Sequence, residues 1–300
     1  MDKTIAVTGG AHKITMGSKV EIDVHAISDA CAFSIAKGAS VELVLTRPVT
    51  LKSGSNKAGL AVPTGAAVTI SADSRYGALN AVGGDSGAGI GGYYGDSSSY
   101  AGGSITILSG TVEATGGSGA AGIGGYSTGT GKDEQIHISG GKVTATGGAG
   151  SAGIGGGDSY SKSNVYGHGT DANGQIIIDG TAVVTATGKD GGAGIGGAYQ
   201  CNGTGTKGKL LLAGSAQVTA SSDSGAGIDA GAASTTAYGT GSYGEILITE
   251  DVVVEASADS GAGIGGSRPD LNGTYYCSYG TGPNGKLTIN GNAQVTATSA

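Results

Sequence analysis

The phrase GAGIGG, or a close variant of it, recurs six times along this chain and constrains its fold more than any other feature. Its copies end at Gly92, Gly125, Gly156, Gly197, Ala230 and Gly266. The same order separates the copies each time: a variable loop rich in Gly, Ser and Tyr, a short apolar strand, a Gly or Asn turn and a strand of the V-T-A-T type. A repeat with a fixed internal order indicates a solenoid, in which each unit packs on its neighbours.

The repeat unit has the size of one coil of a parallel β-helix. From Ile105 to Gly125, without the variable loop, it spans about 21 residues, which suits three short strands joined by tight corners. We therefore predict an all-β, right-handed parallel β-helix (a β-solenoid) of about eight coils, with the variable loops on one corner. Residues 1–40 are expected to form an N-terminal capping coil, and residues 41–300 the repeats of the same single domain, truncated in the middle of a coil.

Alternation along each strand predicts which side chains face the core, because successive residues of a strand point to opposite sides. The first strand of a coil supplies two apolar residues, such as Ile105 and Ile107, and the second supplies Val and Ala, such as Val112 and Ala114. The third supplies a single Ile, such as Ile123. Because Trp is absent and Phe occurs once, these aliphatic ladders must form the core.

Charge and hydropathy argue against two classes of partner. The formal net charge is -7 with a pI near 5.0, and clusters of Lys and Arg that would bind nucleic acid or anionic membranes are missing. No run of about 18 apolar residues predicts insertion into a membrane. The first residues lead straight into repeat-like sequence without a signal peptide, so we expect a monomeric module cut from a longer chain.

The GAGIGG phrase, the VTATGG strands and the ITI-type strands resemble the glycine-rich β-helix repeats of large Gram-positive bacterial surface proteins, some of them labelled carbohydrate-binding. The resemblance covers roughly residues 41–300. It implies an extracellular protein of the bacterial cell surface or cell wall with an adhesin-like or glycan-contacting role. GAGIDA, at residues 225–230, departs from the pattern by replacing two glycines, which puts the geometry of that corner in doubt.

Twelve of the thirteen tyrosines fall in the loops that follow the GAGIGG phrase. They are Tyr93, Tyr94, Tyr100, Tyr126, Tyr160, Tyr166, Tyr199, Tyr238, Tyr243, Tyr275, Tyr276 and Tyr279. Because these loops leave the same corner, they are expected to stack into a ligand-binding surface of Tyr, Ser, Gly and Asn, a composition typical of paratopes. The alternative is that the tyrosines pack as a lid over Ile177, Leu211 and Leu247, three apolar residues on the outer face of neighbouring strands.

A second column of residues lies five positions before each corner Ile and includes Asp190, Asp223 and Asp259 in consecutive coils. Stacked carboxylates repel one another unless hydrogen bonds or a cation intervene, and calcium is the cation that prefers oxygen ligands. The column therefore predicts either a calcium site or a set of local Asx turns to the backbone.

Enzymatic chemistry is not expected. Glu113 and Glu255 lie several coils apart and the four histidines share no column, so no carboxylate constellation for polysaccharide hydrolysis forms in the sequence. Cys201 and Cys277 lie in loops on the same side two coils apart, which leaves both a disulfide and two free thiols open.

The sequence thus predicts a non-catalytic binding module that recognises a glycan or another surface ligand through its Tyr-rich loops. A protein-binding adhesin, a passive structural stalk and, last, a polysaccharide lyase or hydrolase are the alternatives.

Overall fold

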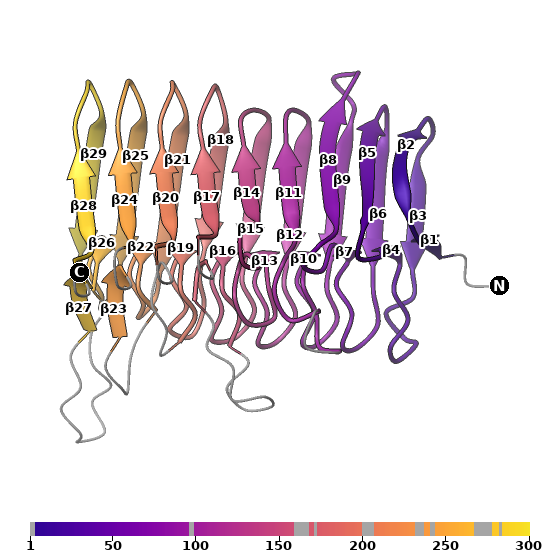
Figure 1. Cartoon of the computed structure of the whole chain (residues 1–300), viewed down its shortest axis with the longest axis horizontal. Coiled ribbons are helices and arrows are strands. Elements are labelled where there is room, and N and C mark those ends of the chain that lie inside the picture. Colours follow the sequence, from indigo (N-terminus) through magenta and orange to yellow (C-terminus); the bar gives the residue numbers. More distant parts are fainter. Residues whose placement is uncertain are drawn as a thin grey trace.

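The computed structural model describes residues 4–95, 99–158, 168–170, 173–199, 207–231, 237–240, 244–266, 278–281 and 284–300, with residues 237–240 and 278–281 described by their backbone alone. These residues form three parallel sheets of nine strands each and one two-stranded sheet. Figure 1 shows the coils side by side along the long axis of the molecule, with the two termini at opposite ends. The chain is a right-handed parallel β-helix, as the repeat predicts.

Each coil contributes one strand to each of the three sheets. The first sheet has the shortest strands: β1 (Ile5–Val7), β4 (Phe33–Ile35), β7 (Leu60–Ala61), β10 (Ile90–Gly91), β13 (Ile123–Gly124), β16 (Ile154–Gly155), β19 (Ile195–Gly196), β22 (Ile228–Asp229) and β26 (Ile264–Gly265). The second sheet contains β2 (Gly10–Met16), β5 (Ala39–Leu45), β8 (Ala67–Ala72), β11 (Ser104–Ile107), β14 (Gln135–Ile138), β17 (Gln175–Ile178), β20 (Lys209–Leu212), β24 (Glu245–Ile248) and β28 (Lys286–Ile289).

The third sheet contains β3 (Val20–Asp23), β6 (Pro48–Lys52), β9 (Ala78–Val82), β12 (Thr111–Thr115), β15 (Lys142–Thr146), β18 (Val183–Thr187), β21 (Gln217–Ser222), β25 (Val253–Ala258) and β29 (Gln294–Ser299). The two-stranded sheet pairs β23 (Ala237–Thr240) with β27 (Ser278–Thr281). The described part contains no helix, and so none that could cross a membrane.

Nine coils are present, where the sequence predicts about eight. The difference lies in the first 40 residues, because β1, β2 and β3 form a complete coil of their own. Residues 1–40 are predicted to form a single capping coil. In the structure β3 closes the first coil, whereas β4 opens the second.

Matching residues of successive coils pair in register, so the predicted ladders form. Ile105 pairs with Ile136, Val112 with Val143 and Ile123 with Ile154, and all six side chains are fully buried. Burying one such side chain stabilises the fold by about 1.5–3 kcal/mol, and the register repeats this contribution in every coil. In the last coil, where β28 lies at the edge of its sheet, Leu287 and Ile289 are 40% and 49% exposed.

The corner after the Ile of β10, β13, β16, β19 and β26 is occupied by glycine. Gly91 has a φ of 131°, and a Cβ built on it would lie 1.9 Å from the carbonyl oxygen of Gly124 in the next coil. Gly124, Gly155, Gly196 and Gly265 have similar positive φ values. Asp229 occupies this corner in the GAGIDA coil with a φ of 110°, and its side chain is buried.

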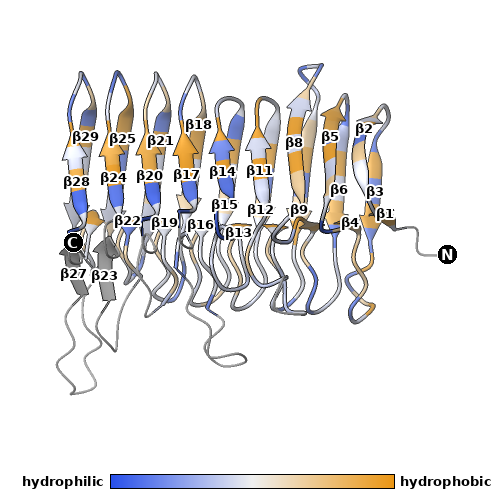
Figure 2. Cartoon of the chain, viewed as in Figure 1, coloured by the Kyte–Doolittle hydropathy of each residue, from blue (hydrophilic) through white to orange (hydrophobic). Residues whose placement is uncertain are grey.

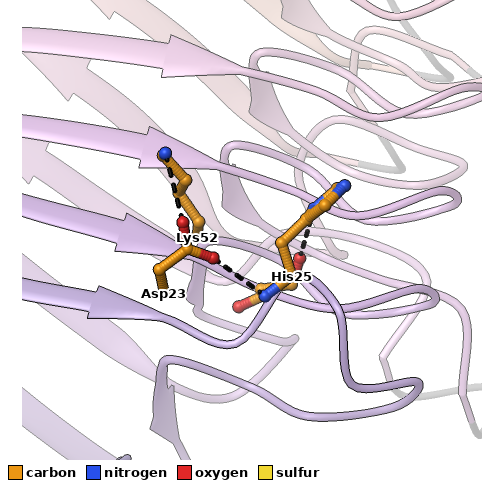
Figure 3. A network of polar contacts seen from close by, with 4 residues as sticks. Asp23, His25 and Lys52 are labelled. Atoms are coloured by element: carbon orange, nitrogen blue, oxygen red, sulfur yellow. Dashed lines mark hydrogen bonds and ion pairs between the residues drawn. The ribbon is translucent and has the colours of Figure 1, made fainter.

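Polar contacts connect the first two coils at the ends of β3 and β6 (Figure 3). One carboxylate oxygen of Asp23 accepts the backbone N–H of His25 at 3.1 Å, and the other forms an ion pair with Lys52 at 3.2 Å. The His25 N–H and then the Lys52 ammonium hold the pKa of the Asp23 carboxyl below its usual value. Because both charged side chains are partly exposed to water, this ion pair orients the turn more than it stabilises the fold.

Candidate functional site

A groove of about 540 Å³ crosses the turns that precede β10, β13, β16 and β19. Its lining residues are Asp85, Ser86, Ser118, Gly119, Tyr126, Ala149, Gly150, Asp158, Asp190 and Tyr199. The turns supply seven of them, and the segments that follow β13, β16 and β19 supply Tyr126, Asp158 and Tyr199. The groove therefore combines two features that the sequence suggests separately, the column of turn residues and the tyrosines of the loops.

The floor of the groove is regular because the turns hydrogen-bond to one another. The N–H of Ser86 donates to the carbonyl oxygen of Ser118 at 2.9 Å, and the N–H of Gly119 donates to that of Ala149 at 3.1 Å. Ser86, Gly119 and Gly150 adopt positive φ values of 64°, 75° and 72°. Equivalent residues of successive turns are thus displayed about one strand spacing apart.

The wall of the groove is held over this floor by backbone contacts. The N–H of Asp158 donates to the hydroxyl of Ser151 at 3.1 Å, and the N–H of Tyr199 donates to the carbonyl oxygen of Gly150 at 2.8 Å. A Cβ on Gly150 would lie 2.6 Å from Oδ2 of Asp158. The missing side chain at Gly150 therefore gives the Asp158 carboxylate its place in the groove.

Three loop tyrosines pack on one another at one end of the groove. Tyr126 lies edge-on to Tyr94 and Tyr100, with ring centroids 5.5 Å and 5.9 Å away, and Tyr94 stacks on Tyr100 at 6.1 Å. Tyr126 is 1% exposed, and its hydroxyl has no hydrogen bond of good geometry within the described chain. Burial, then the neighbouring phenols and Asp158, raise the pKa of Tyr126 to about 12, although the nearby Ser86 hydroxyl offsets part of the rise.

The structure divides the predicted tyrosine surface into parts with different surroundings. Tyr126 and Tyr199 line the groove, Tyr94 and Tyr100 support Tyr126, and the Tyr93 ring packs against the Lys57 ammonium at 4.5 Å. Tyr238 and Tyr279 are backbone partners in the two-stranded sheet β23–β27. Five others lie outside the described residues: Tyr160, Tyr166, Tyr243, Tyr275 and Tyr276.

In the aspartate column, the carboxylate of Asp223 accepts hydrogen bonds from the backbone of the preceding coil. Oδ2 of Asp223 accepts the N–H of Asp190 at 2.8 Å, and Oδ1 accepts the N–H of Gly191 at 3.1 Å, so this carboxylate connects two coils. Burial alone would raise the pKa of Asp223, but these hydrogen bonds and those from Ser224 outweigh it and hold the pKa below its usual value. Asp223 thus bonds to backbone N–H groups, as the Asx-turn alternative predicts, but the N–H groups belong to the neighbouring coil.

Calcium binding by Asp190, Asp223 and Asp259 stays a prediction. Asp190 lines the groove together with Asp85, whereas neither Asp223 nor Asp259 is a lining residue. Within the described ranges no group of three or more His, Cys, Asp or Glu side chains is arranged to hold a metal ion.

The predicted pair Cys201 and Cys277 lies outside the described residues. Cys31, on the second coil, is a free thiol whose Sγ lies 3.4 Å from the carbonyl oxygen of Phe33. Burial raises the pKa of this thiol. Cys31 is thus a partly buried thiol that packs against Ala58, Ala61 and Ala88, and not a reactive surface thiol.

The outer face of the second sheet carries an apolar stripe formed by Ile177, Leu211 and Leu247. Figure 2 shows hydrophobic colour along β17, β20 and β24, the strands that carry these residues. The three residues are half-buried and line a shallow pocket of about 210 Å³ together with the polar Gln175, Lys209 and Glu245 and with Leu210. The predicted lid of tyrosines is not found here in the described part of the chain, because no described tyrosine lines this pocket.

Two residues of interest escape sequence reasoning. Asp158 follows a copy of the GAGIGG phrase at the position that Tyr94 and Tyr199 occupy after other copies, so no column of like residues signals its place in the groove. Asp229 does carry a signal, because it replaces the corner glycine, but its complete burial becomes visible only in the structure.

Comparison with known proteins supports the repeat and nothing finer. Three segments, residues 105–129, 136–158 and 176–199, match the family model described as a beta helix repeat. No curated protein and no solved structure matches the chain. The first two segments begin in β11 and β14 and run through the corner strands β13 and β16 into the wall of the groove. The matched segments therefore include Ser118, Tyr126, Asp158 and Tyr199 of the groove, whereas Asp85 and Ser86 lie outside them.

Proposed function

We propose that this chain is a non-catalytic binding module that holds a glycan along the groove between Asp85 and Tyr199. The groove itself supports the proposal: it is concave, and it combines aromatic rings with hydroxyls and carboxylates on a rigid floor. Tyr offers an apolar ring and a polar tip, which suits the mixed apolar and hydroxyl surface of a sugar. The hydrogen-bonded turns hold these groups in place before a ligand arrives, which lowers the entropic cost of binding.

The resemblance to Gram-positive surface repeats supports an extracellular place for the module, on the cell surface or in the cell wall. In that setting a glycan or a surface protein would be the partner, and the β-helix would act as a rigid support that presents the groove. No nucleic acid and no membrane insertion belong to this proposal, in line with the acidic composition.

A glycan array probed with the protein and with the variant Tyr199→Ser tests the proposal. Tyr199 suits the test because it is partly exposed, whereas substitution of the buried Tyr126 would also disturb the tyrosine cluster. We expect binding to a defined glycan class that Tyr199→Ser abolishes without a change in melting temperature. Tyr76→Ser is the matched control, because Tyr76 is 51% exposed and packs on Arg47 and Arg75, away from the groove.

A blank array, or binding that Tyr199→Ser leaves intact, would overturn the proposal. A hydrolase or lyase remains the competing interpretation of the groove, since Asp85, Asp158 and Asp190 place three carboxylates on it. Incubation of each array-positive glycan with the protein decides between the two, because an enzyme would release new reducing or unsaturated ends and a binding module would release none.

A protein-binding adhesin is a second candidate, and the apolar stripe favours it. Ile177, Leu211 and Leu247 form a flat row with charged residues beside it, an arrangement typical of protein contact surfaces. If a protein partner binds there, Leu211→Lys should abolish capture of that partner and leave glycan binding unchanged. Loss of glycan binding in the same variant would place both activities on one surface and contradict this separation.

A further inference from the structure

We propose that Arg47 and Arg75 form a binding site for a sulfate or phosphate ester group carried by a sugar. The site lies at the edge where the second and third sheets meet, apart from the groove, so this inference goes beyond the proposed function and does not depend on it. Two guanidinium groups that pack on one exposed tyrosine ring, and that form no ion pair within the described chain, carry the argument.

Three successive turns bring exposed basic residues to this edge. Lys19 lies in the connection from β2 to β3, Arg47 in that from β5 to β6 and Arg75 in that from β8 to β9. Figure 1 shows these connections side by side near the N-terminal end of the β-helix. The hydroxyl of Ser74 donates to the carbonyl oxygen of Thr46 at 2.7 Å, which connects the second turn to the third. The coils thus gather basic residues that are far apart in the sequence.

Tyr76 holds the two arginines together. The Cζ atom of Arg47 lies 5.2 Å from the centroid of the Tyr76 ring, and that of Arg75 lies 4.7 Å from it, so the two Cζ atoms are no more than 9.9 Å apart. The guanidinium of Arg75 also donates a hydrogen bond to the Tyr76 hydroxyl. Because contact with an aromatic ring restricts a long side chain, part of the entropic cost of ordering these arginines is met before a ligand binds.

Both guanidinium groups keep donors for a ligand. The ion pairs of the described chain involve neither arginine, and their hydrogen bonds there go to the carbonyl oxygen of Thr46 and to the Tyr76 hydroxyl. A guanidinium carries five N–H donors, so these bonds use only a small part of them. Two positive charges held this close repel each other, and an anion between them removes that repulsion. Since both side chains are exposed, a ligand can reach them.

A tetrahedral ester group suits this pair of arginines better than a carboxylate does. A carboxylate has two oxygens, which a single guanidinium fork can occupy. A sulfate or phosphate ester has three unesterified oxygens, so it can accept hydrogen bonds from two forks at once. The pairing of Arg47 with Arg75 therefore favours an ester group over a uronic acid.

A sugar with one such group suits the surroundings better than a polymer with a charge at every unit. The chain has a formal net charge of -7, and the exposed Asp73 lies two residues before Arg75. These charges repel nucleic acid and anionic membranes, which bind larger basic surfaces. The Asp73 carboxylate and the Tyr76 hydroxyl can instead accept hydrogen bonds from the hydroxyls of a sugar beside its ester group.

Nuclear magnetic resonance titration with N-acetylglucosamine, its 6-sulfate and its 6-phosphate tests the inference. The chain contains three arginines, so the side-chain Nε–H signals of Arg47 and Arg75 can be assigned by substitution. We expect both esters to shift these signals and to bind about tenfold more tightly than the neutral sugar or better, and the tighter of the two identifies the preferred ester. Glucuronic acid should bind about threefold more weakly than the esters. Added salt should weaken ester binding, because exposed charges are screened.

Variants connect this preference to the two arginines. Arg47→Gln with Arg75→Gln should lower the affinity for the esters about tenfold, to that for the neutral sugar. Arg47→Lys with Arg75→Lys keeps both charges but lacks the fork, so it should bind the esters and glucuronic acid about equally. Lys132→Gln with Lys142→Gln is the matched control, because it removes the same charge from two exposed lysines in other coils, and it should leave ester binding unchanged.

Each contrary outcome overturns a distinct statement. Equal binding of the esters and the neutral sugar, or ester binding that the double Gln variant of the arginines retains, would refute the site. Equal or tighter binding of glucuronic acid to the original protein would refute the choice of a tetrahedral group. Tighter binding of an otherwise neutral peptide with one phosphoserine would refute the choice of a sugar. These results are independent of the groove, where Tyr76→Ser serves as a control with neutral glycans, which offer the arginines no anionic group.

Discussion

Replacing Asp229 with glycine should stabilise this protein, although almost all substitutions of buried residues destabilise. Asp229 occupies the corner that glycine fills in β10, β13, β16, β19 and β26. Its φ of 110° is strained for a residue with a Cβ, and its carboxyl group is fully buried with Oδ1 unpartnered in the described structure. Asp229→Gly removes both the strain and the buried carboxyl.

The expected gain follows from three contributions. A strained φ of this kind costs of order 1–3 kcal/mol, and a buried polar group without a partner costs about 1–3 kcal/mol. The glycine itself lowers the free energy of unfolding by about 0.5–1 kcal/mol, because it makes the unfolded chain more flexible. We therefore expect Asp229→Gly to raise the free energy of unfolding by about 2 kcal/mol at neutral pH, measured by urea unfolding followed by circular dichroism.

The pH dependence of the gain identifies its cause. Burial raises the pKa of Asp229 well above its usual value, so the folded state favours the neutral carboxyl. The penalty from ionisation is absent below the unfolded pKa near 3.8 and grows as the pH rises through the folded pKa. The difference between Asp229→Gly and the original protein should thus be smallest in acid and largest at neutral or higher pH.

Two further variants and one outcome complete this test. Gly196→Asp introduces the same side chain one coil earlier, where a Cβ would lie 2.1 Å from the carbonyl oxygen of Asp229, and it should destabilise strongly. Asp259→Gly removes an exposed aspartate and should change stability by less than about 0.5 kcal/mol. If Asp229→Gly is less stable than the original at neutral pH, the carboxyl is a structural ligand of this corner and the reasoning is wrong.

Three other predictions concern the groove and the column beside it. Tyr126→Ala should lower the free energy of unfolding by about 3–5 kcal/mol, because it empties the centre of the tyrosine cluster; a loss below about 1 kcal/mol in urea unfolding would contradict that packing. Gly150→Ala should abolish glycan binding while the far-ultraviolet spectrum stays the same, because the new Cβ displaces the Asp158 carboxylate; unimpaired binding would show that this carboxylate is not needed. The lowered pKa of Asp223 means that its contribution is present above the unfolded pKa of about 3.8 and is lost as the pH falls through the folded pKa. Asp223→Asn should therefore reduce stability at neutral pH by less than about 1 kcal/mol and flatten this acid dependence, and an unchanged acid profile in thermal unfolding would argue against the inter-coil contact.

The coils were predictable because their determinants are local and repeat. Ile105, Val112 and Ile123 are each one member of a ladder whose spacing is visible in the sequence, and each is fully buried as expected. The first coil was harder to predict, since Ile5–Val7 and Gly10–Met16 lack both the GAGIGG and the V-T-A-T phrases. Terminal repeats are under different constraints because one of their faces meets no neighbour, so the shared pattern fades there.

The groove was less predictable because it depends on where two segments of each coil meet. The turn before a corner strand and the segment after it are separated by the GAGIGG phrase, yet Tyr126 and Asp158 from the later segments lie over Gly119 and Gly150 of the turns. Sequence columns compare equivalent positions of different coils, and they give no information on contacts between non-equivalent positions. The loop tyrosines therefore predicted one continuous surface, whereas those that the structure describes with their side chains belong to a cluster, a groove wall and a separate contact with Lys57.

The division between constant and variable parts of the repeat also explains how a β-helix can carry a specific site. The ladders and corner glycines fix the floor so firmly that Gly91 leaves no room even for a Cβ, and no choice of residue remains there for function. The segments after the corner strands carry no ladder and can vary in length without disturbing the core. Specificity must therefore come from residues such as Asp158 and Tyr199, which the loops place over a floor that every coil supplies in nearly the same form. A change of ligand between related β-helices should accordingly require new loops and few changes in the coils beneath them.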